Sequence, residues 1–477
     1  MPNFLRFLTY QYYLLQEENY DLNRFITSVR KKTFRLKTLE FKRELTWTKK
    51  MKLVALIALT FQLLFIIPVI FIGVVETLIA LIVCWLFQFV FITIAVVLIK
   101  PLDKGQKNKI IEAGKAKILA WKEPKKRIIA IAGSYGKTSM KEALVTVLSQ
   151  KYRVLATVGN ENTPIGISRL VQDKLDPTID ILICELGEYV PGDITELCEL
   201  VNPDIGIITG INEAHLERMG NLNNTVETIF ELAHSLRDSS LLLLNGDDNN
   251  IVKNHLTHCQ QLDIQFYTKE NNPLSSWQFQ NSLFIESQLA FAGDLFNKTR
   301  NLKIPFKINS IANYSLGLAM ASTILALDLN IPESKITTGI SKIQPAQHRL
   351  NAIPGQKGII VIDDTYNGNP DGVLEAVNAM QNFKNRRKVF ITPGLVELGT
   401  GSQLIHYNLG QKIGAKIDSL MVISNENTIK MCEGALEVNP NLIIRKFYST
   451  KELHGSLGTT LEPNDLALFQ NDLTDNY

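Results

Sequence analysis

The chain has 477 residues, of which 45% are hydrophobic and 20% are charged. This composition is ordinary for a globular protein of about three domains, and it excludes a disordered, collagen-like or coiled-coil chain. The 50 Lys and Arg against 47 Asp and Glu leave a net charge of +3, so the overall charge does not indicate nucleic-acid binding. The five cysteines lie far apart without a C-x-x-C pair, which argues against a disulfide framework or a cysteine-rich zinc site.

Residues 1–52 are predicted to form a basic N-terminal arm. They contain 12 Lys and Arg against 5 Asp and Glu, and the positive charges are densest over residues 30–37. Such an arm can lie on anionic lipid headgroups, or it can be the solvated face of a helix. The charge pattern is the same in both cases, so both alternatives stay open.

Residues 53–100 are predicted to form a transmembrane helical hairpin. Between Lys52 and Lys100 the only charged residue is Glu76, and the stretch is long enough for two spans of about 20 residues each. We expect the spans at residues 53–72 and 78–99, with a turn at residues 73–76. The alternative, a buried hairpin of a soluble domain, is disfavoured because apolar residues occur on every face.

The flanking charges predict the orientation of this hairpin. Lys49, Lys50 and Lys52 precede the first span, whereas Lys100 and Lys104 follow the second. Positive charge at both outer ends places both ends on the cytoplasmic side. The predicted location is therefore the cell membrane, crossed twice, with the domains that follow in the cytoplasm.

After a predicted linker helix at residues 101–126, short apolar runs alternate with helical patterns. This alternation predicts a mostly parallel α/β architecture. We expect one domain at residues 127–345 and a second at residues 346–477, joined through a segment rich in Pro and Gly at residues 344–358. Weaker alternation at residues 276–291 suggests an inserted antiparallel hairpin. The apolar runs lie at residues 128–132, 179–184, 205–209, 241–244, 359–362, 389–392, 420–423 and 466–469.

A glycine-rich loop follows the first of these runs and opens a helical pattern, which is the context of a nucleotide phosphate loop. Its glycines let backbone N–H groups approach phosphates, and the helix N-terminus adds partial positive charge. Lys137 is expected to reach the β- and γ-phosphates, and Thr138 to hold Mg²⁺. The alternative is a glycine-rich turn with a surface lysine. The predicted nucleotide-binding residues of this loop are Gly133, Ser134, Tyr135, Gly136, Lys137, Thr138 and Ser139.

Further segments follow the loop in chain order: TVGNEN at 157–162, ELG at 185–187, NEAHLE at 212–217, an arginine at 349 and DDTYNGNP at 363–370. With these segments, residues 128–477 resemble the Mur ligase family, and most closely its MurF branch. The resemblance implies an α/β fold with a P-loop central domain and a Rossmann-like C-terminal domain, here preceded by the transmembrane hairpin.

The resemblance also implies roles for individual residues. The catalytic residues that it implies are Lys137, Glu185, His215 and Arg349, and the metal ligands are Thr138, Glu185 and His215. Beyond the phosphate loop, the nucleotide is expected at Asn309, Asn313, Arg349, Asp363 and Asp364. The substrate is expected at Thr157, Asn160, Asn162, Tyr366, Asn367 and Asn369.

The chemistry implied by the resemblance is ATP-dependent amide bond formation with ATP and Mg²⁺. A substrate carboxylate attacks the γ-phosphate to give an acyl phosphate, and an amine then displaces phosphate. Such a reaction depends mainly on positioning and on neutralising charge. The expected partners are ATP, a lipid-linked or UDP-linked carboxylate precursor of the cell wall or envelope, an amino-acid or dipeptide amine, and membrane lipids, but no nucleic acid.

Two departures from the family pattern leave alternatives open. The predicted arm and hairpin stand where MurF has its uridine-binding domain, which leaves room for a ligase of the capsule or polyglutamate type. By spacing, Ala233 falls where many members carry a carbamylated lysine. That substitution leaves room for a nucleotide-binding regulator with impaired catalysis.

Overall fold

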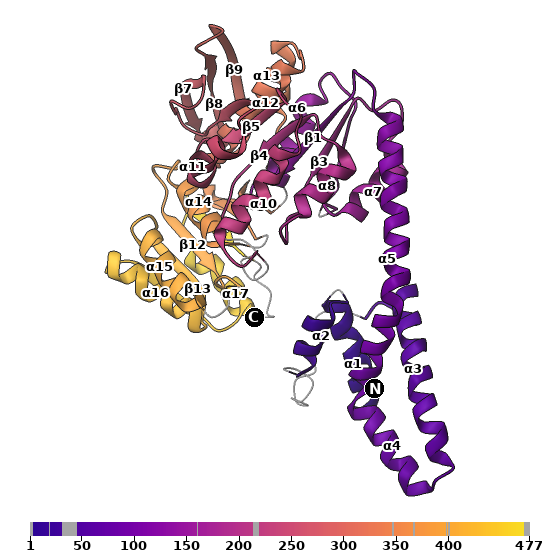
Figure 1. Ribbon diagram of the computed structural model, residues 1–477. Helices are drawn as coiled ribbons and strands as arrows, with labels where there is room; N and C mark the ends of the chain where they lie inside the picture. Colours follow the sequence, from indigo (N-terminus) through magenta and orange to yellow (C-terminus); the bar gives the residue numbers. More distant parts are fainter. Residues whose placement is uncertain are drawn as a thin grey trace. The chain divides into compact units, whose positions relative to one another are not determined.

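The structure of the chain is a computed structural model. It describes residues 3–18, 20–30, 45–159, 161–212, 219–345, 348–365, 368–396, 398 and 401–471. The chain divides into two compact units, Met1–Glu112 and Ala113–Tyr477. In Figure 1 the colours run from indigo at the N-terminus to purple over the helix α5, within which the division between the two units falls.

The first unit is helical. Its helices are α1 (Asn3–Glu17), α2 (Leu22–Ser28), α3 (Lys49–Ile70), α4 (Val74–Leu86) and the greater part of α5 (Gln88–Trp121). An apolar core joins four of these helices, with Leu14 of α1, Phe25 of α2, Val54 of α3 and Ile92 of α5 all fully buried. The segment predicted as a basic arm therefore includes two packed helices, and residues 31–44 lie outside the described residues.

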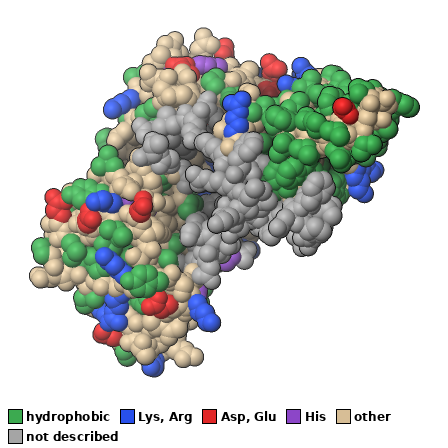
Figure 2. Space-filling view, turned by 90° about the horizontal axis from the view of Figure 1, so that it is seen from below, with side chains coloured by type: hydrophobic (Ala, Val, Ile, Leu, Met, Phe, Trp, Pro, Cys, Tyr) green, Lys and Arg blue, Asp and Glu red, His purple; other side chains and the backbone are tan. Residues whose placement is uncertain are grey.

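Beyond this core, α3 and α4 expose most of their apolar side chains. The two helices are joined by a turn at residues 71–73, and Glu76 lies in the first turn of α4. Leu64 is 61% exposed and Ile79 is 56% exposed. Figure 2 shows hydrophobic side chains gathered over this part of the unit. By length and composition, α3 with its 22 residues is able to cross a membrane.

The second predicted span, at residues 78–99, is not one straight helix. Helix α4 ends at Leu86, α5 begins at Gln88, and the two are bent by 64° at the break. The backbone of Phe87 leaves the helical region there, with φ −104° and ψ 23°. The transmembrane hairpin is therefore not confirmed, because a second crossing exists only if the bent pair counts as one span.

The central domain of the second unit is built on a six-stranded sheet in the order β2-β3-β1-β4-β5-β6. All of its pairings are parallel, which confirms the predicted α/β architecture. In a parallel sheet all the carboxyl ends lie at one edge, where open α/β sheets bind ligands. The strands are β1 (Arg127–Ala132), β2 (Val154–Ala156), β3 (Ile181–Glu185), β4 (Ile205–Ile208), β5 (Leu241–Asn245) and β6 (Asp263–Tyr267).

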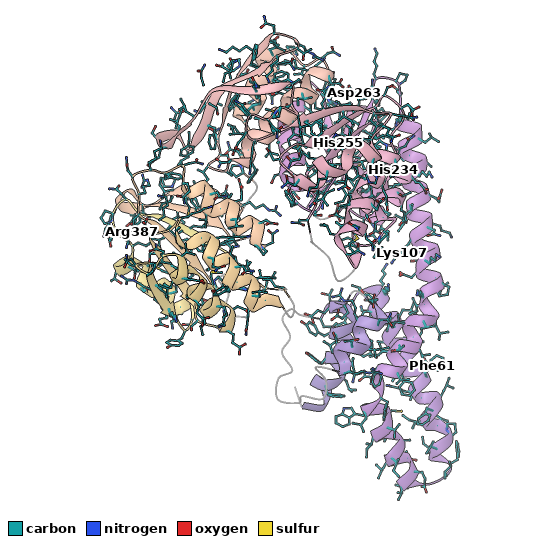
Figure 3. The ribbon with its side chains drawn as sticks, turned by 60° about the vertical axis from the view of Figure 1, so that its left-hand side comes forward. Phe61, Lys107, His234, His255, Asp263 and Arg387 are labelled. Carbon is teal, nitrogen blue, oxygen red and sulfur yellow. The ribbon has the colours of Figure 1, made fainter. Side chains whose placement is uncertain are left out.

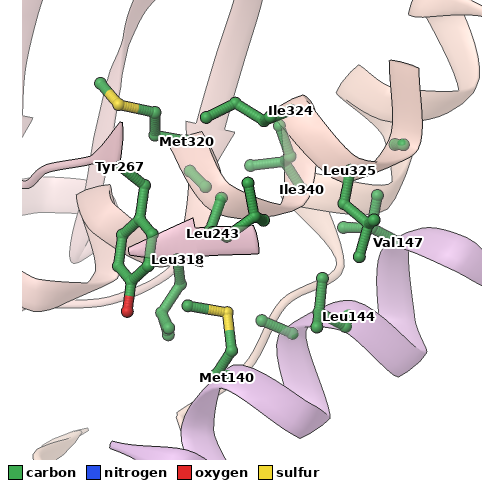
Figure 4. Close-up of a cluster of buried hydrophobic side chains, with 14 of the residues drawn as sticks. Met140, Leu144, Val147, Leu243, Tyr267, Leu318, Met320, Ile324, Leu325 and Ile340 are labelled. Atoms are coloured by element: carbon green, nitrogen blue, oxygen red, sulfur yellow. The ribbon is translucent and has the colours of Figure 1, made fainter. Parts of the chain in front are cut away.

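Helices cover this sheet and bury its strands. They are α6 (Lys137–Leu148), α7 (Pro164–Lys174), α8 (Asp193–Val201), α10 (Leu222–His234), α11 (Asn249–His258), α12 (Tyr314–Asp328) and α13 (Glu333–Ser341). Figure 4 shows part of the resulting core, in which Met140 and Leu144 of α6 belong to the same buried cluster as Leu325 of α12 and Ile340 of α13. This packing fixes α6, and with it the loop that precedes α6.

An antiparallel sheet is inserted between β6 and α12. The sequence predicts a hairpin at residues 276–291, and the structure has three strands in the order β7-β8-β9. Both pairings are antiparallel. The strands are β7 (Trp277–Ile285), β8 (Ala290–Asn297) and β9 (Leu302–Ile308), with a short 3₁₀ turn at Glu286–Gln288.

The C-terminal domain holds a second six-stranded sheet, in the order β10-β11-β15-β12-β13-β14. Strand β10 is antiparallel to β11, and the other pairings are parallel. The strands are β10 (Asn351–Pro354), β11 (Ile360–Asp364), β12 (Lys388–Thr392), β13 (Ser419–Ile423), β14 (Ile443–Phe447) and β15 (Leu466–Gln470). The helices are α14 (Pro370–Met380), α15 (Ser402–Gly414), α16 (Glu426–Val438) and α17 (Thr450–Thr460).

An ion pair with a buried carboxylate lies just before β12 and β15 of this second sheet. Arg387, labelled in Figure 3, donates from Nε to Oδ1 of Asp465 at 3.0 Å and from Nη2 to Oδ2 at 2.6 Å, and Asp465 is 1% exposed. Arg387→Met leaves this carboxylate buried without its cation. We expect the free energy of unfolding, measured with denaturant, to fall by about 3 kcal/mol.

The matched control is Lys430→Met on α16. Lys430 pairs with Glu433 at 2.6 Å, but both side chains are more than 40% exposed. Exposed pairs contribute about 0–1 kcal/mol, so this variant should unfold almost as the wild type does. Equal losses in the two variants would contradict a stabilising role for the pair of Arg387 with Asp465.

Candidate functional site

A cavity of ≈ 820 Å³ lies at the carboxyl ends of β1, β3, β4 and β5. The central domain lines the cavity with residues 134–140, which follow β1, and with residues at or just after the carboxyl ends of β3, β4 and β5. The C-terminal domain contributes Arg349, Leu350 and Asp364, together with the first turn of α14. Because both domains line the same cavity, a ligand bound there contacts both of them.

The loop between β1 and α6 has the backbone that a phosphate loop requires. Gly133 has φ +142° and Gly136 has φ +80°, and both values favour glycine. A Cβ atom at Gly133 would lie 2.4 Å from Oγ1 of Thr209, so the loop also passes too close to β4 for any other residue. The first N–H groups of α6 begin at Lys137, next to the cavity.

Lys137 is held inside the cavity by two acceptors. Its Nζ donates to the carbonyl oxygen of Gly133 and lies 2.9 Å from both carboxylate oxygens of Glu188. The side chains of Lys137 and Glu188 are only 13% and 2% exposed. Burial raises the pKa of Glu188, and the charge of Lys137 opposes that rise.

Glu185, at the end of β3, joins a second buried ion pair. Its Oε2 lies 3.0 Å from Nζ of Lys141, a lysine of α6 that is fully buried. Thr138 Oγ1 donates to the same carboxylate, at 3.2 Å and 3.1 Å from its two oxygens. The hydroxyl and the carboxylate that the sequence predicts as metal ligands are therefore in contact.

Two residues of the segment at 157–162 contact the stretch of chain that begins at Glu185. Thr157 Oγ1 accepts a hydrogen bond from the backbone N–H of Glu185 at 3.0 Å, and Thr157 is 2% exposed. Asn162 lines the cavity, and its backbone carbonyl oxygen accepts a hydrogen bond from the backbone N–H of Gly187 at 2.9 Å. Thr157 thus holds the backbone of Glu185 from behind, whereas Asn162 faces the cavity.

The acidic pair at the end of β11 is divided between two environments. Asp364 lines the cavity and accepts a hydrogen bond from Leu350 N–H at 3.3 Å. Asp363 instead accepts a hydrogen bond from Thr365 Oγ1 at 2.7 Å and pairs with His348 Nδ1 at 2.8 Å. Only the second carboxylate of the pair is directed toward the cavity.

Side chains of the two domains also contact each other at the rim. Asn212 Nδ2 donates to Asp371 at 3.2 Å, and Lys269 pairs with Glu375 at 3.5 Å. Glu375 also accepts a hydrogen bond from the backbone N–H of Tyr314 at 3.3 Å. These contacts hold α14 of the C-terminal domain against the central domain.

Comparison with known families and proteins identifies this architecture. Residues 131–326 match the Mur ligase middle domain, and residues 348–469 match the Mur ligase glutamate ligase domain. The chain belongs to the Mur ligase family. The UDP-N-acetylmuramoyl-tripeptide–D-alanyl-D-alanine ligase of Bacillus subtilis is 26% identical over 346 residues, which cover 72% of this chain and 72% of that protein. The ligase of the same name from Escherichia coli is 23% identical, covering 70% and 73%.

Solved structures of Mur ligases share the fold. MurF from Acinetobacter baumannii superposes with a TM-score of 0.66 at 21% identity and covers 78% of each chain. MurF from Thermotoga maritima in complex with ADP has a TM-score of 0.65 at 22% identity, covering 77% of this chain and 81% of that one. These matches confirm the fold that the sequence predicts for the second unit of this Mur ligase.

Several residues predicted for the nucleotide and the substrate lie outside the cavity. Asn309 donates to the carbonyl oxygen of Ser341 at 2.8 Å, and Asn313 accepts a hydrogen bond from Asn382 at 3.1 Å. Neither asparagine lines the cavity, and the side of α12 that does so presents Tyr314. Both amides serve instead as structural links, whereas Asn369 of the predicted substrate set does line the cavity.

Four of the predicted site residues lie outside the described residues. They are Asn160, His215, Tyr366 and Asn367. Ala233, which marks the departure from the family's lysine, is buried in α10 at 4% exposure and does not line the cavity. Within the described ranges, no group of three or more His, Cys, Asp and Glu is placed to hold a metal ion.

The sequence did not indicate Lys141 and Glu188. These two residues form ion pairs with the predicted residues Glu185 and Lys137. Lys141 lies one turn beyond Lys137 on α6, and Glu188 follows Glu185 by three residues. A lysine on a helix and a glutamate in a loop are ordinary surface residues in most proteins. The only signal was the proximity of Glu188 to the end of a buried strand.

The two carboxylates of β11 predict opposite pH effects on stability. Burial raises the pKa of Asp364 to about 6, so the folded Mur ligase binds this proton more tightly than the unfolded chain does. The contribution of Asp364 to stability therefore falls as the pH rises from about 4 to about 6. We expect the melting temperature of Asp364→Asn, relative to that of the wild type, to rise over this pH range and to stay at the higher value at higher pH.

Asp363→Asn is the control with the opposite sign. Burial opposes the ionisation of Asp363, but hydrogen bonds from Thr365 and His348 prevail and lower its pKa. Its stabilising contribution is present at neutral pH and is lost on acidification. The melting temperature of Asp363→Asn should therefore lie furthest below that of the wild type at neutral pH, and the difference should become smaller at acidic pH. If the melting temperatures of the two variants depend on pH in the same way, the opposite pKa shifts assigned to Asp364 and Asp363 are contradicted.

Proposed function

We propose that this chain is an ATP-dependent amide ligase of the MurF kind, which joins D-alanyl-D-alanine to UDP-N-acetylmuramoyl-tripeptide. The similarity to relatives that bear this name extends over both ligase domains. The observation that carries the proposal is the shared cavity, in which the phosphate loop and Glu185 face Arg349 and Asp364 of the other domain. A site that both domains line can align an activated carboxyl group with an incoming amine.

The residues on the central-domain side fit the triphosphate of ATP. The N–H groups at the start of α6 and the ammonium group of Lys137 supply positive charge where the phosphates enter. Thr138 and Glu185 offer the oxygen ligands that Mg²⁺ prefers. Bound Mg²⁺ would neutralise charge on the phosphate oxygens during transfer.

The reaction then runs in two steps. The C-terminal carboxylate of the tripeptide attacks the γ-phosphorus of ATP, ADP leaves, and an acyl phosphate forms. The amine of the dipeptide attacks the acyl carbon, phosphate leaves, and a proton is lost from the new amide. Lys137 and Arg349 stabilise the negative charge of the transferring phosphoryl group, because both line the cavity from opposite domains.

A screen of substrates tests this assignment. Purified full-length protein in detergent is supplied with ATP, Mg²⁺, one carboxylate and one amine, and both ADP and product mass are measured. We expect the amide product from UDP-N-acetylmuramoyl-tripeptide and D-alanyl-D-alanine. A product only with lipid-linked or polyglutamate acceptors would identify a different ligase, and ATP use without any amide product would identify the nucleotide-binding regulator.

We also propose that the first unit tethers the ligase to the cytoplasmic face of the cell membrane. This proposal is supported by the exposed apolar side chains of α3 and α4 and by the lysines at both ends of the apolar stretch. A tether raises the effective concentration of the enzyme near membrane-held partners but contributes no group to the chemistry.

Removal of residues 1–112 tests the tether. The remaining chain, 113–477, has its own apolar cores and holds every described residue of the cavity. We expect this variant to stay in the supernatant when it is sedimented with anionic liposomes, whereas the full-length protein sediments with them. Its turnover on soluble substrates should equal that of the full-length protein. Complete loss of activity in a folded truncated protein would contradict a purely tethering role.

A further inference from the structure

Glu188 is an acidic residue in the phosphate region whose role the proposed reaction leaves open. It lies on the loop that follows β3, lines the cavity and is 3% exposed. Both of its carboxylate oxygens contact Lys137, the residue that is also expected to bind the phosphates of ATP. Lys137 therefore has two competing anionic partners.

The charges in this region balance before a nucleotide binds. Lys137 pairs with Glu188 at 2.9 Å, and Lys141 pairs with Glu185 at 3.0 Å. Phosphates that engage Lys137 take the cation away from Glu188. A buried carboxylate without a cation is strongly unfavourable, and burial already raises the pKa of Glu188. Binding of the nucleotide thus leaves Glu188 either to take up a proton or to meet a new cation.

A buried amide oxygen nearby favours the cation. Oδ1 of Asn162 is buried and has no hydrogen-bond partner within the described part of the chain. Asn162 lines the cavity and is 9% exposed, and a Cβ atom at Gly187 would lie 2.8 Å from this oxygen. This orphaned acceptor lies beside Gly187, a residue between Glu185 and Glu188 in the sequence, and such an acceptor is expected where a cation or a water bound to it completes the contacts.

We propose that Glu188 exchanges partners during the cycle: it pairs with Lys137 in the nucleotide-free enzyme and becomes a ligand of the divalent cation when the phosphates engage Lys137. Together with Thr138 and Glu185 it gives the site three oxygen ligands from the chain. The proposal rests on the proposed ATP-dependent function. It adds to that function a residue which none of the motifs includes.

Mn²⁺ provides the probe. Purified full-length protein is titrated with Mn²⁺ in the presence of ADP, and free Mn²⁺ is followed by electron paramagnetic resonance. We expect Glu188→Gln to weaken Mn²⁺ binding about tenfold or more, as loss of groups around bound metals does. In EDTA, the same variant should bind ADP more tightly than the wild type, because Lys137 has lost its competing partner.

Glu199→Gln is the matched control, because Glu199 follows Glu188 in the same part of the chain and is exposed on α8. It should change neither measurement. Glu185→Gln should weaken Mn²⁺ binding under the proposed function, whatever the role of Glu188. If Glu185→Gln weakens Mn²⁺ binding while Glu188→Gln leaves both measurements unchanged, the role of Glu188 is overturned and the function stands. If the wild type binds neither ADP nor Mn²⁺, the proposed function itself fails.

Discussion

Lys137→Ala is expected to lower ATP-dependent turnover by about two to three orders of magnitude, the cost of removing a group that stabilises transition-state charge. The ammonium group lies in the cavity against Gly133 and Glu188, where the phosphates are expected. Folding should survive, because the neighbouring carboxylate can be protonated when its cation is gone. The measurement is kcat and KM for ATP, with circular dichroism to verify the fold.

Lys335→Ala serves as the control for this variant. Lys335 is an exposed lysine of α13, outside the cavity. Its removal should leave turnover unchanged. Near-normal turnover in a folded Lys137→Ala protein would show that the loop does not bind the phosphates that react.

Lys141→Met is expected to destabilise the protein by about 3–5 kcal/mol, the cost of leaving a buried charge without its partner. Lys141 is fully buried and contacts Glu185, which is 4% exposed. The free energy of unfolding is measured by denaturant titration in EDTA and without nucleotide, so that no cation replaces the lysine.

The double variant Lys141→Met/Glu185→Gln separates stability from catalysis. Removing both charges should restore most of the lost stability, because a neutral amide and a thioether can be buried together at low cost. Activity should stay lost, since Glu185 is a proposed metal ligand. A double variant as unstable as Lys141→Met alone would mean that the lysine stabilises α6 by packing rather than by pairing with Glu185.

The interior strands of both sheets could be predicted from the sequence, and the edge strands could not. The predicted apolar runs correspond to β1, β3, β4, β5, β11, β12, β13 and β15. The strands without a predicted run in these two sheets are β2, β6, β10 and β14, which are the two edges of each sheet. Interior strands are covered on both faces and therefore need continuous apolar sequence, whereas an edge strand such as β14, with Arg445 and Lys446, is half solvated.

The site could be predicted as far as local motifs reach. Lys137 and Thr138 follow from the spacing of glycines between a strand and a helix, and they lie where that motif places them in the fold. Their partners Glu185 and Glu188 lie at the end of β3 and in the loop after it, about 50 residues further along the chain. No sequence pattern states which of two nearby carboxylates meets which lysine, because that choice depends on the packing of β3 against β1.

The break in the second apolar stretch shows a different limit. Residues 78–99 carry no charge and are mostly apolar, with Gln88 and Thr93 as polar side chains, and the stretch contains no proline or glycine that would mark a bend. The break at Phe87 coincides with the burial of Gln88 in the helical unit, where its Nε2 lies 3.5 Å from the carbonyl oxygen of Leu8. Composition can indicate an apolar segment, but it does not indicate whether that segment forms one straight helix.

The most direct test of amide ligation through an acyl phosphate follows one oxygen atom. UDP-N-acetylmuramoyl-tripeptide labelled with ¹⁸O in its C-terminal carboxylate is incubated with the full-length protein, ATP, Mg²⁺ and D-alanyl-D-alanine, and the phosphate released is analysed by mass spectrometry. The mechanism predicts that each amide bond formed transfers one labelled oxygen to phosphate. Unlabelled phosphate released at the same rate with or without the amine would contradict it, because the ATP would then be hydrolysed by water.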